Sequence, residues 1–492
     1  MVFNSLHFAA FFLVVYALYR RLPHRGQNWL LLAASYYFYA AWDWRFLGLL
    51  IATTLVAYAC GILLGRADDR RRRKLVLLLG LGFNLAVLGF FKYFNFFAEN
   101  LQAVLALAGW RTDGFTLKVL LPVGISFYTF VAMSYVIDAY RRQIEPERSL
   151  LDVAVFIGFF PTLLAGPIAR ASVLLRQIRS PRAPARAQVT EGLWLILWGC
   201  FKKMYVADNL AHVADGVFAA GGAPSGMATI LGTIAYAFQI YGDFSGYTDV
   251  ARGTSMLLGV ELNINFRFPY FVRTPQEFWS HWHISLSEWL RDYIFLPVSY
   301  ALSRRLDGVR WLGRRDDFWI YSGATAVTML LGGLWHGAAW TFVLWGAYQG
   351  LLLVIFRFFM GGRRRHRRGP QLEWTFQWRD LPAVLPMFGL TCYGWLIFRA
   401  DSWSQITGLT GRIFTALPLV SPLSSGKSAA GPTSISPQAA AFHPATNRAA
   451  SPGIPGVRYR KSGLTSRLLA EDAPRQVAAT LAKTQTRAYR CR

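Results

Sequence analysis

His336 is an ionisable side chain in a long stretch of sequence that otherwise carries no charge. No Asp, Glu, Lys or Arg occurs from Phe318 to Phe356, and His336 lies within the segment LLGGLWHGAAWTFVLWG (330–346). Ionisable groups are costly in apolar surroundings, so such a residue is by default a functional candidate. A neutral imidazole near pH 7 can take a proton from a hydroxyl group while that oxygen attacks an acyl carbon. The alternatives are a histidine that hydrogen-bonds across helices and one in a loop between two spans.

The length of this charge-free run predicts a break close to His336. A continuous helix over residues 318–356 would be roughly 58 Å long, about twice the hydrocarbon thickness of a bilayer. Gly332, Gly333 and Gly337 surround the histidine and are the natural place for the helix to bend or end. Small residues there would also let neighbouring helices approach closely.

A second histidine pair lies in TPQEFWSHWHISLSEWLRDYIFLP (274–297), which we predict to be one helix from Pro275 to Pro297. On such a helix His283 faces apolar neighbours, whereas His281 lies on a polar face. The two rings point apart, so the pair is a poor metal site. For His283 a functional role and a core histidine satisfied by a backbone carbonyl are equally supported. His281 is interpreted as a solvated surface residue.

Other nucleophilic or metal-dependent chemistry has little support in the sequence. There is no G-x-S-x-G elbow, and no cysteine lies beside a histidine and a carboxylate. The four cysteines have no paired spacing, so neither a disulfide framework nor a metal site is expected; they are Cys60, Cys200, Cys392 and Cys491. A histidine base without a protein nucleophile favours direct transfer over a covalent intermediate.

The composition predicts an all-α polytopic membrane protein. Of the 492 residues, 54% are hydrophobic, and many apolar runs are long enough to cross a bilayer. The net charge of +26 lies in short loops between these runs, so nucleic-acid binding receives little weight. Because such loops normally face the cytoplasm, we expect a multi-pass protein with its N-terminus on the outer face of the membrane.

Two later regions depart from regular spanning helices. Residues 156–170 contain Pro161, Gly166 and Pro167 and read as a broken or re-entrant segment, which is tolerated only inside protein or beside a water-filled cavity. From about Ser421 the chain is rich in Ser, Ala, Pro and Gly and then basic, and we expect it to be disordered.

Six ordered motifs resemble those of the membrane-bound O-acyltransferases, in particular the bacterial branch of alginate O-acetyltransferases. They are LPVGISFYTFVAMSYVIDAYR (121–141), FFPTLLAGPIAR (159–170), FKKMYVADNLA (201–211), QIYGDFSGYTDVARG (239–253), FWSHWHISLSEWLRDYIFLP (278–297) and the His336 segment (330–346).

The resemblance implies about ten or more transmembrane or re-entrant helices around an acyl-transfer tunnel. It maps the catalytic histidines of the family onto His336 and His283. No cofactor would be bound; acetyl-CoA would be the cytoplasmic acyl donor, and an exported polysaccharide such as alginate the acceptor, with periplasmic acetyltransferase proteins as partners. Residues of the matching motifs that are candidates for substrate binding are Trp335, Trp282, Asp243, Ser245, Arg291 and Asp292.

This sequence differs from the family pattern at three places. Ser280 and His281 stand where arginine is usual, and Gly242 replaces a bulky aromatic residue. Family members generally continue through further hydrophobic helices where this chain becomes polar. We therefore expect a membrane domain over residues 1–417 with an incomplete C-terminal end, followed by a low-complexity basic tail over residues 418–492.

Three alternatives to acetyl transfer remain open from the sequence. Within the same superfamily, the chain could transfer D-alanine to teichoic acid. The broken helices and the intramembrane histidine also fit a non-catalytic transporter of polysaccharide or acyl groups. Finally, the chain could pass the acyl group to a periplasmic partner that completes the transfer.

Overall fold

Helices are the main secondary structure in the part of the chain that the computed structural model describes, which comprises residues 1–110, 117, 120–219, 223–360 and 377–416. These residues form α-helices and short π- and 3₁₀-helical turns but no β-strand, which confirms the all-α prediction. The predicted domain boundary at residue 417 and the tail over residues 418–492 lie outside the described residues.

The first half of the described chain contains twelve α-helices. They are α1 (Leu6–Tyr19), α2 (His24–Asp43), α3 (Leu47–Arg66), α4 (Arg70–Leu88), α5 (Phe94–Leu107), α6 (Ile125–Tyr140), α7 (Leu150–Gly158), α8 (Phe160–Leu163), α9 (Arg176–Arg179), α10 (Arg186–Phe201), α11 (Asp208–Phe218) and α12 (Gly226–Leu257).

Seven further α-helices follow in the described residues after a non-helical stretch. They are α13 (Pro275–His281), α14 (Ile284–Leu290), α15 (Leu296–Leu306), α16 (Asp316–His336), α17 (Trp340–Met360), α18 (Leu381–Arg399) and α19 (Trp403–Ala416). A π-helical segment, Gly89–Tyr93, joins α4 to α5.

Five helical runs in the described residues are long and apolar enough to cross a membrane. They are His24–Arg66, Arg70–Leu107, Asp316–His336, Trp340–Met360 and Trp378–Arg399. Helix α1 is also apolar but shorter. The chain is therefore a multi-pass membrane protein, whereas the expected total of ten or more spanning or re-entrant helices stays a prediction.

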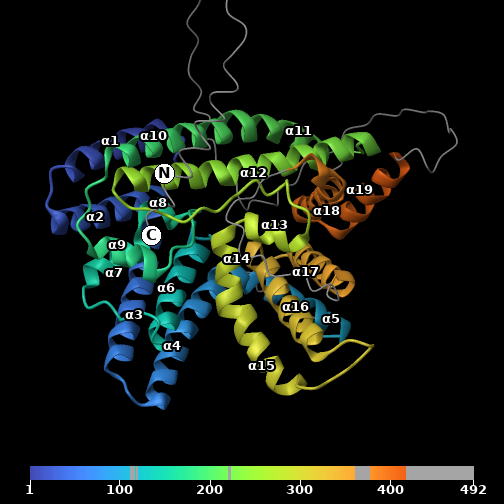
Figure 1. The fold of residues 1–492 in the computed structure, drawn as a ribbon, viewed down its shortest axis with the longest axis horizontal. Coiled ribbons are helices and arrows are strands. Elements are labelled where there is room, and N and C mark those ends of the chain that lie inside the picture. Colours follow the sequence, from blue (N-terminus) through green and yellow to red (C-terminus); the bar gives the residue numbers. More distant parts are fainter. Residues whose placement is uncertain (111–116, 118–119, 220–222, 361–376, 417–492) are drawn as a thin grey trace, which may run out of the picture. The chain divides into compact units, whose positions relative to one another are not determined.

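Small residues allow the long helices to pack closely. Helices α10 and α11 follow one another along the length of α12, and both pack against it (Figure 1). A Cβ atom on Gly199 of α10 would lie only 2.5 Å from the carbonyl oxygen of Gly246 on α12. The close contact of these two helices therefore requires glycine, as is common where helices pack in a membrane.

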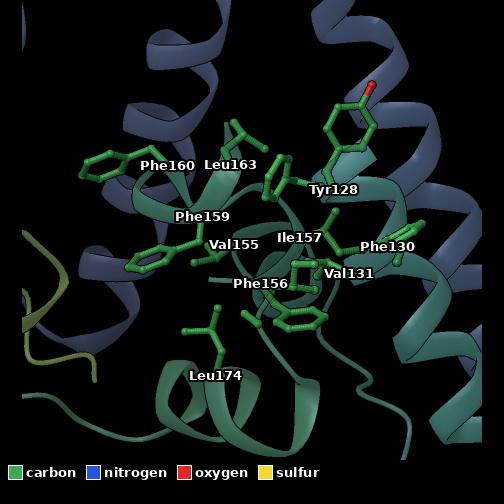
Figure 2. Close-up of a cluster of buried hydrophobic side chains, with 14 of the residues drawn as sticks. Tyr128, Phe130, Val131, Val155, Phe156, Ile157, Phe159, Phe160, Leu163 and Leu174 are labelled. Carbon is green, nitrogen blue, oxygen red and sulfur yellow. The ribbon is translucent and has the colours of Figure 1, made fainter. Parts of the chain in front are cut away.

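The buried side chains form two hydrophobic clusters. The first cluster centres on α6, nearly all of whose residues are buried. Figure 2 shows part of it, with Tyr128 and Phe130 of α6, Phe156 of α7, and Phe159, which lies between α7 and α8. The second cluster is formed around α18 by Trp282, Trp345, Trp395 and their neighbours.

The segment over residues 156–170 is broken, as its prolines and glycine predict. Helix α7 ends at Gly158, only the four-residue α8 follows, and residues 164–170 are not α-helical, although most of this stretch is buried. The amide of Phe160 donates to Ser35 Oγ at 3.1 Å, and the amide of Ile168 donates to Ser285 Oγ at 2.9 Å. Non-helical backbone is thus tolerated here because side chains of other segments satisfy it.

We predict that Gly333→Ala destabilises the α16–α17 hairpin by about 1–3 kcal/mol, because inserted atoms in a tight contact force the backbone apart. A Cβ atom on Gly333 would collide with the carbonyl of Phe342, and 3.1 Å would separate it from Gly346 Cα. Thermal unfolding in detergent measures the effect. The matched control is Gly389→Ala in α18, where a Cβ atom meets nothing within 4 Å. Equal unfolding temperatures for both variants would contradict the prediction.

Candidate active site

His336 is the last residue of α16, at the point where the charge-free run is interrupted. Gly337 has an extended backbone (φ −163°, ψ 150°), and α17 begins three residues later at Trp340. The predicted break beside the histidine is therefore confirmed. A side chain on residue 337 would collide with the ring of Phe342, so the turn also depends on glycine.

Two side chains from the π-helical segment donate hydrogen bonds to the backbone carbonyl groups at the end of α16. The last carbonyl groups of a helix have no partner within the helix. Tyr93 donates its hydroxyl to the carbonyl of Leu334 at 3.1 Å, and the Lys92 ammonium donates to the carbonyl of Trp335. Lys92 also donates to Ser126 Oγ on α6 at 3.1 Å. A cation at this position is also stabilised by the negative end of the α16 dipole.

The His336 ring is enclosed by aromatic side chains. Its centroid lies 4.9 Å from that of Trp335, 5.1 Å from that of Trp345 and 5.2 Å from that of Phe398. Trp335 belongs to the first hydrophobic cluster and Trp345 to the second. The break after α16 therefore places His336 at the boundary between the two clusters.

The single helix expected over residues 275–297 was wrong, because the chain breaks at Trp282 and His283. Trp282 is extended, and His283 has a left-handed backbone with φ 42°. The segment before it supplies the replacement hydrogen bonds: the carbonyl of Asn265 accepts from Ile284 N, and the carbonyl of His281 accepts from Arg267 N, both at 3.0 Å. These long-range bonds outweigh the local helical pattern.

His283 is buried beside the His336 segment. Only 1% of the residue is exposed, and neither ring nitrogen has a hydrogen-bond partner among the described residues. Its ring centroid lies 4.6 Å from that of Phe244 and 6.0 Å from that of Trp335, so Trp335 contacts both histidines. The interpretation as a core histidine satisfied by a backbone carbonyl does not fit this arrangement.

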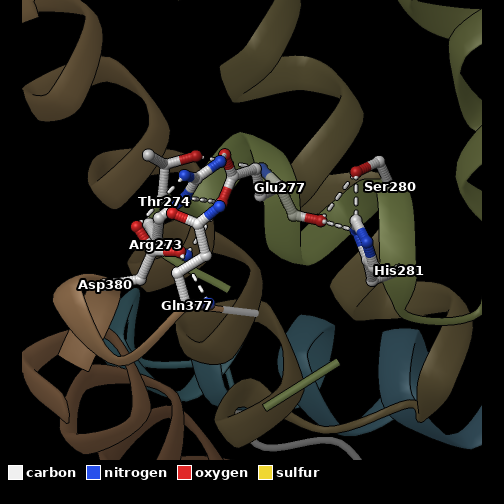
Figure 3. Close-up of polar contacts among 7 residues, drawn as sticks. All are labelled: Arg273, Thr274, Glu277, Ser280, His281, Gln377 and Asp380. Atoms are coloured by element: carbon white, nitrogen blue, oxygen red, sulfur yellow. Dashed lines mark hydrogen bonds and ion pairs between the residues drawn. The ribbon is translucent and has the colours of Figure 1, made fainter. Parts of the chain in front are cut away.

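His281 is the last residue of α13 and belongs to a separate polar group along this helix (Figure 3). Its Nδ1 is 2.8 Å from the carbonyl oxygen of Glu277 and 3.0 Å from Ser280 Oγ. Arg273 donates to Glu277 at 2.9 Å and to Asp380 at 3.4 Å. The hydrogen bond to Glu277 raises the pKa of Arg273 above its usual value. This group anchors α13 to the start of α18.

The remaining sequence candidates lie in four places. Trp335 contacts both histidines, and Trp282 lies in the second cluster, 4.7 Å from Trp395. Two candidates bond to consecutive lysines: Asp243 pairs with Lys203 at 2.5 Å, and Ser245 accepts from Lys202 at 3.0 Å.

Arg291 and Asp292 belong to another ionic group. Arg291 pairs with Asp292 at 2.8 Å, and Asp292 also pairs with Arg170 at 2.8 Å. Among the described residues, no hydrogen bond or ion pair joins Asp243, Ser245, Arg291 or Asp292 to either histidine, so the structure does not bring them together with the imidazoles.

Sequence reasoning missed Lys92, Tyr93 and Ser126. None of the three was among the sequence candidates, although a lysine within FFKYFNFF (90–97) is as unusual as the histidine in its own apolar run. The same rule on buried ionisable groups would have identified Lys92. It could not have shown that the ammonium group meets the carbonyl beside His336.

A cavity of about 370 Å³ begins two residues after His336. Its walls come from α5 and from the starts of α17 and α19. The lining residues are Phe96, Glu99, Asn100, Ala338, Ala339, Trp340, Thr341, Asp401, Ser402 and Trp403.

These features define a class of protein: a multi-pass helical membrane protein with two histidines at neighbouring helix breaks and a cavity next to one of them. Residues 146–379 match the model of the membrane-bound O-acyltransferase family. A probable alginate O-acetylase from Pseudomonas putida is 40% identical over 417 residues, which cover 84% of this chain and 80% of that protein. The chain belongs to the membrane-bound O-acyltransferase family and is an acyltransferase.

Relatives with other printed activities are less similar. A peptidoglycan O-acetyltransferase from Helicobacter pylori is 32% identical over 78% of this chain and 73% of its own length. A teichoic acid D-alanyltransferase from Bacillus subtilis is 25% identical over 56% of this chain and 68% of its own length.

The backbone at His283 yields a test that separates strain from chemistry. A non-glycine residue at φ 42° is strained. We therefore expect His283→Gly to unfold at a higher temperature than His283→Ala, because its free energy of unfolding is about 1 kcal/mol larger. Thermal unfolding of both proteins in detergent measures this difference. An alanine variant as stable as the glycine variant would show that the left-handed backbone is not imposed by its surroundings.

Proposed function

We propose that this chain transfers acetyl groups from acetyl-CoA on the cytoplasmic side of the inner membrane to hydroxyl groups of an exported polysaccharide such as alginate. The N-terminus would be periplasmic, and a tunnel through the helices would lead the acyl group to the histidines. The similarity to the alginate O-acetylases supports this substrate class, because it extends over most of both chains. The observation that carries the proposal is the position of His336 at a break in an apolar helix, next to a cavity.

In this mechanism His336 acts as the general base. Its ring takes the proton of the acceptor hydroxyl while that oxygen forms a bond to the acyl carbon. The carbonyl double bond opens to an oxyanion, which then re-forms the double bond and expels the thiolate of the donor. The proton on His336 passes to that thiolate, so the enzyme returns to its starting state. The aromatic residues around His336 exclude water that would otherwise hydrolyse the donor.

Lys92 is the residue that we assign to the oxyanion. An ammonium group has three N–H donors. Within the described residues, the Trp335 carbonyl and Ser126 Oγ take two of them. The third is left for a developing negative charge, and a fixed cation in a water-poor site stabilises such a charge strongly.

His283 is assigned to the same site through Trp335, which contacts both rings. Its two ring nitrogens have no hydrogen-bond partner among the described residues, which leaves them available to a substrate group. We propose Trp335 and Trp282 as walls of the acyl path, and Asp243, Ser245, Arg291 and Asp292 as binding residues for parts of the substrates farther from the reacting atoms. Periplasmic acetyltransferase proteins are the proposed partners.

Two other functions are alternatives to acetyl transfer. D-alanyl transfer is less well supported, because the D-alanyltransferase relatives are less similar and match a smaller part of this chain. A transporter that catalyses no reaction would need the broken helices but no general base.

The decisive test measures the O-acetyl content of exopolysaccharide from cells that express wild type, His336→Ala or His283→Ala at matched protein levels. Loss of a general base predicts a fall of about 10²–10⁴ for His336→Ala. His281→Ala is the matched control, because this histidine lies two residues from His283 within the polar group of α13. Normal acetylation in the His336 variant would refute its catalytic role. Failure to export unmodified polymer would favour the transporter.

For Lys92 we predict that Lys92→Gln lowers kcat by about 10²–10³ and leaves KM for the donor unchanged, as expected for a group that binds the oxyanion. Lys92→Arg should recover part of the rate, since it restores the charge. Tyr93→Phe is the control, because it removes the neighbouring helix-end hydrogen bond without changing charge. Equal losses in Lys92→Gln and Tyr93→Phe would reduce Lys92 to a structural role.

A further inference from the structure

The cavity between α5 and the starts of α17 and α19 exposes two tryptophan side chains. Trp340 and Trp403 belong to its lining, and 64% and 65% of these residues are exposed. Trp340 is held in place, because its Nε1 donates to Asn100 Oδ1 at 2.8 Å and its ring centroid lies 5.6 Å from that of Phe96. The open face of an indole ring attracts a cation more strongly than that of any other aromatic side chain.

The charge of the cavity is negative. Among the described residues that line it, Glu99 and Asp401 carry carboxylates and none is a lysine or arginine. Glu99 has no ion pair within the described part of the chain. Arg399 Nη1 lies 3.9 Å from Asp401, but Nη2 of the same side chain pairs with Asp215 at 3.0 Å. The cavity therefore has negative charge that the described side chains do not fully neutralise, and a cationic ligand would match it.

The remaining polar groups of the lining fit the same kind of ligand. Thr341 and Ser402 supply hydroxyl oxygens, which can accept hydrogen bonds, whereas lysine and arginine side chains have only donors. The volume of about 370 Å³ lies in the lower part of the usual range of about 300–1,000 Å³ for small-molecule sites. A cavity of this size can take up a long side chain, whereas a folded domain would rest on its rim.

The distribution of basic residues indicates that the cavity lies on the outer side of the membrane. In the sequence RRRRK (70–74) stands at the start of α4, basic residues precede α16, and RRRHRR (363–368) follows α17. Such segments normally face the cytoplasm. The lining comes from the opposite helix ends: the α16–α17 and α18–α19 turns and α5, which lies at the far end of the spanning run Arg70–Leu107.

We propose that this cavity binds a lysine or arginine side chain of a partner protein on the outer side of the membrane, an inference that rests on the proposed function for the presence of such a partner. The tryptophan faces would contact the aliphatic stem and the charge of that side chain. The carboxylates of Glu99 and Asp401 would pair with its ammonium or guanidinium group. Among the partners of the proposed function, a protein is the one that supplies cationic side chains.

The test uses the full chain in nanodiscs of phosphatidylcholine, which has no net charge, and two glycine-rich peptides with blocked ends. One peptide carries a central lysine, and the other carries norleucine, which has the same four side-chain carbon atoms but no ammonium group. Saturation-transfer NMR measures binding of each peptide. We expect binding of the lysine peptide only, and binding that weakens as salt screens the ion pairs.

Variants then locate the bound side chain. Glu99→Gln combined with Asp401→Asn should weaken binding of the lysine peptide about tenfold, because both negative charges are removed. Trp403→Ala should weaken it about two- to fivefold. Glu145→Gln, which removes an exposed carboxylate outside the lining, is the matched control and should change nothing. In cells, the double variant should lower the O-acetyl content of exopolysaccharide several-fold at matched protein levels.

Chemical coupling gives an independent reading of the site. A water-soluble carbodiimide joins a carboxylate to the lysine amine of a bound peptide as an amide, and the carbodiimide takes up the released water as a urea. Mass spectrometry should find the lysine peptide on Glu99 or Asp401. Coupling only at other carboxylates would contradict the proposed site.

Four further outcomes would overturn the inference. They are equal binding of both peptides, binding of neither, binding unchanged in the double variant, and normal acetylation in cells that express it. Calcium binding that calorimetry detects in wild type but not in the double variant, without binding of the lysine peptide, would assign the carboxylates to a metal ion instead. If the inference fails in any of these ways while acetylation still depends on His336, the proposed function stands. If His336→Ala equals wild type in cells, the proposed function itself fails.

Discussion

The site depends on one constraint: the backbone carbonyl groups at the end of α16 must accept hydrogen bonds from other parts of the chain. A helix that stops inside an apolar interior exposes carbonyl groups that water cannot reach. Lys92 and Tyr93 meet this need for Trp335 and Leu334. The same interaction brings a cation to the carbonyl of the residue before His336, where the proposed mechanism uses its charge.

The break at His283 is likewise stabilised by hydrogen bonds to backbone groups that have no partner within a helix. Asn265 accepts the amide of Ile284 through its backbone carbonyl and that of Ser285 through its side chain. His283 can therefore take a left-handed backbone within buried surroundings. Both breaks occur where the chain passes between the two hydrophobic clusters, and Trp335 links the two imidazoles across that boundary.

This arrangement explains why aromatic residues surround the histidines. Their rings fill the boundary between the clusters, and the indole N–H groups of Trp335 and Trp345 have no hydrogen-bond partner among the described residues. In such surroundings a few fixed charges act over longer distances than in water. Lys92, which donates to the carbonyl of the residue before His336, is the charge that the proposed mechanism uses for the developing anion.

Some of these features follow from the order of residues alone. The helical class, the break at Gly337 and the candidate role of His336 were predictable, because they depend on local length, polarity and glycine content. The break at His283 and the contact of Lys92 with the Trp335 carbonyl were not. Both depend on hydrogen bonds between residues distant in sequence, Asn265 with Ile284 and Lys92 with Trp335, and only the tertiary structure decides which distant groups meet.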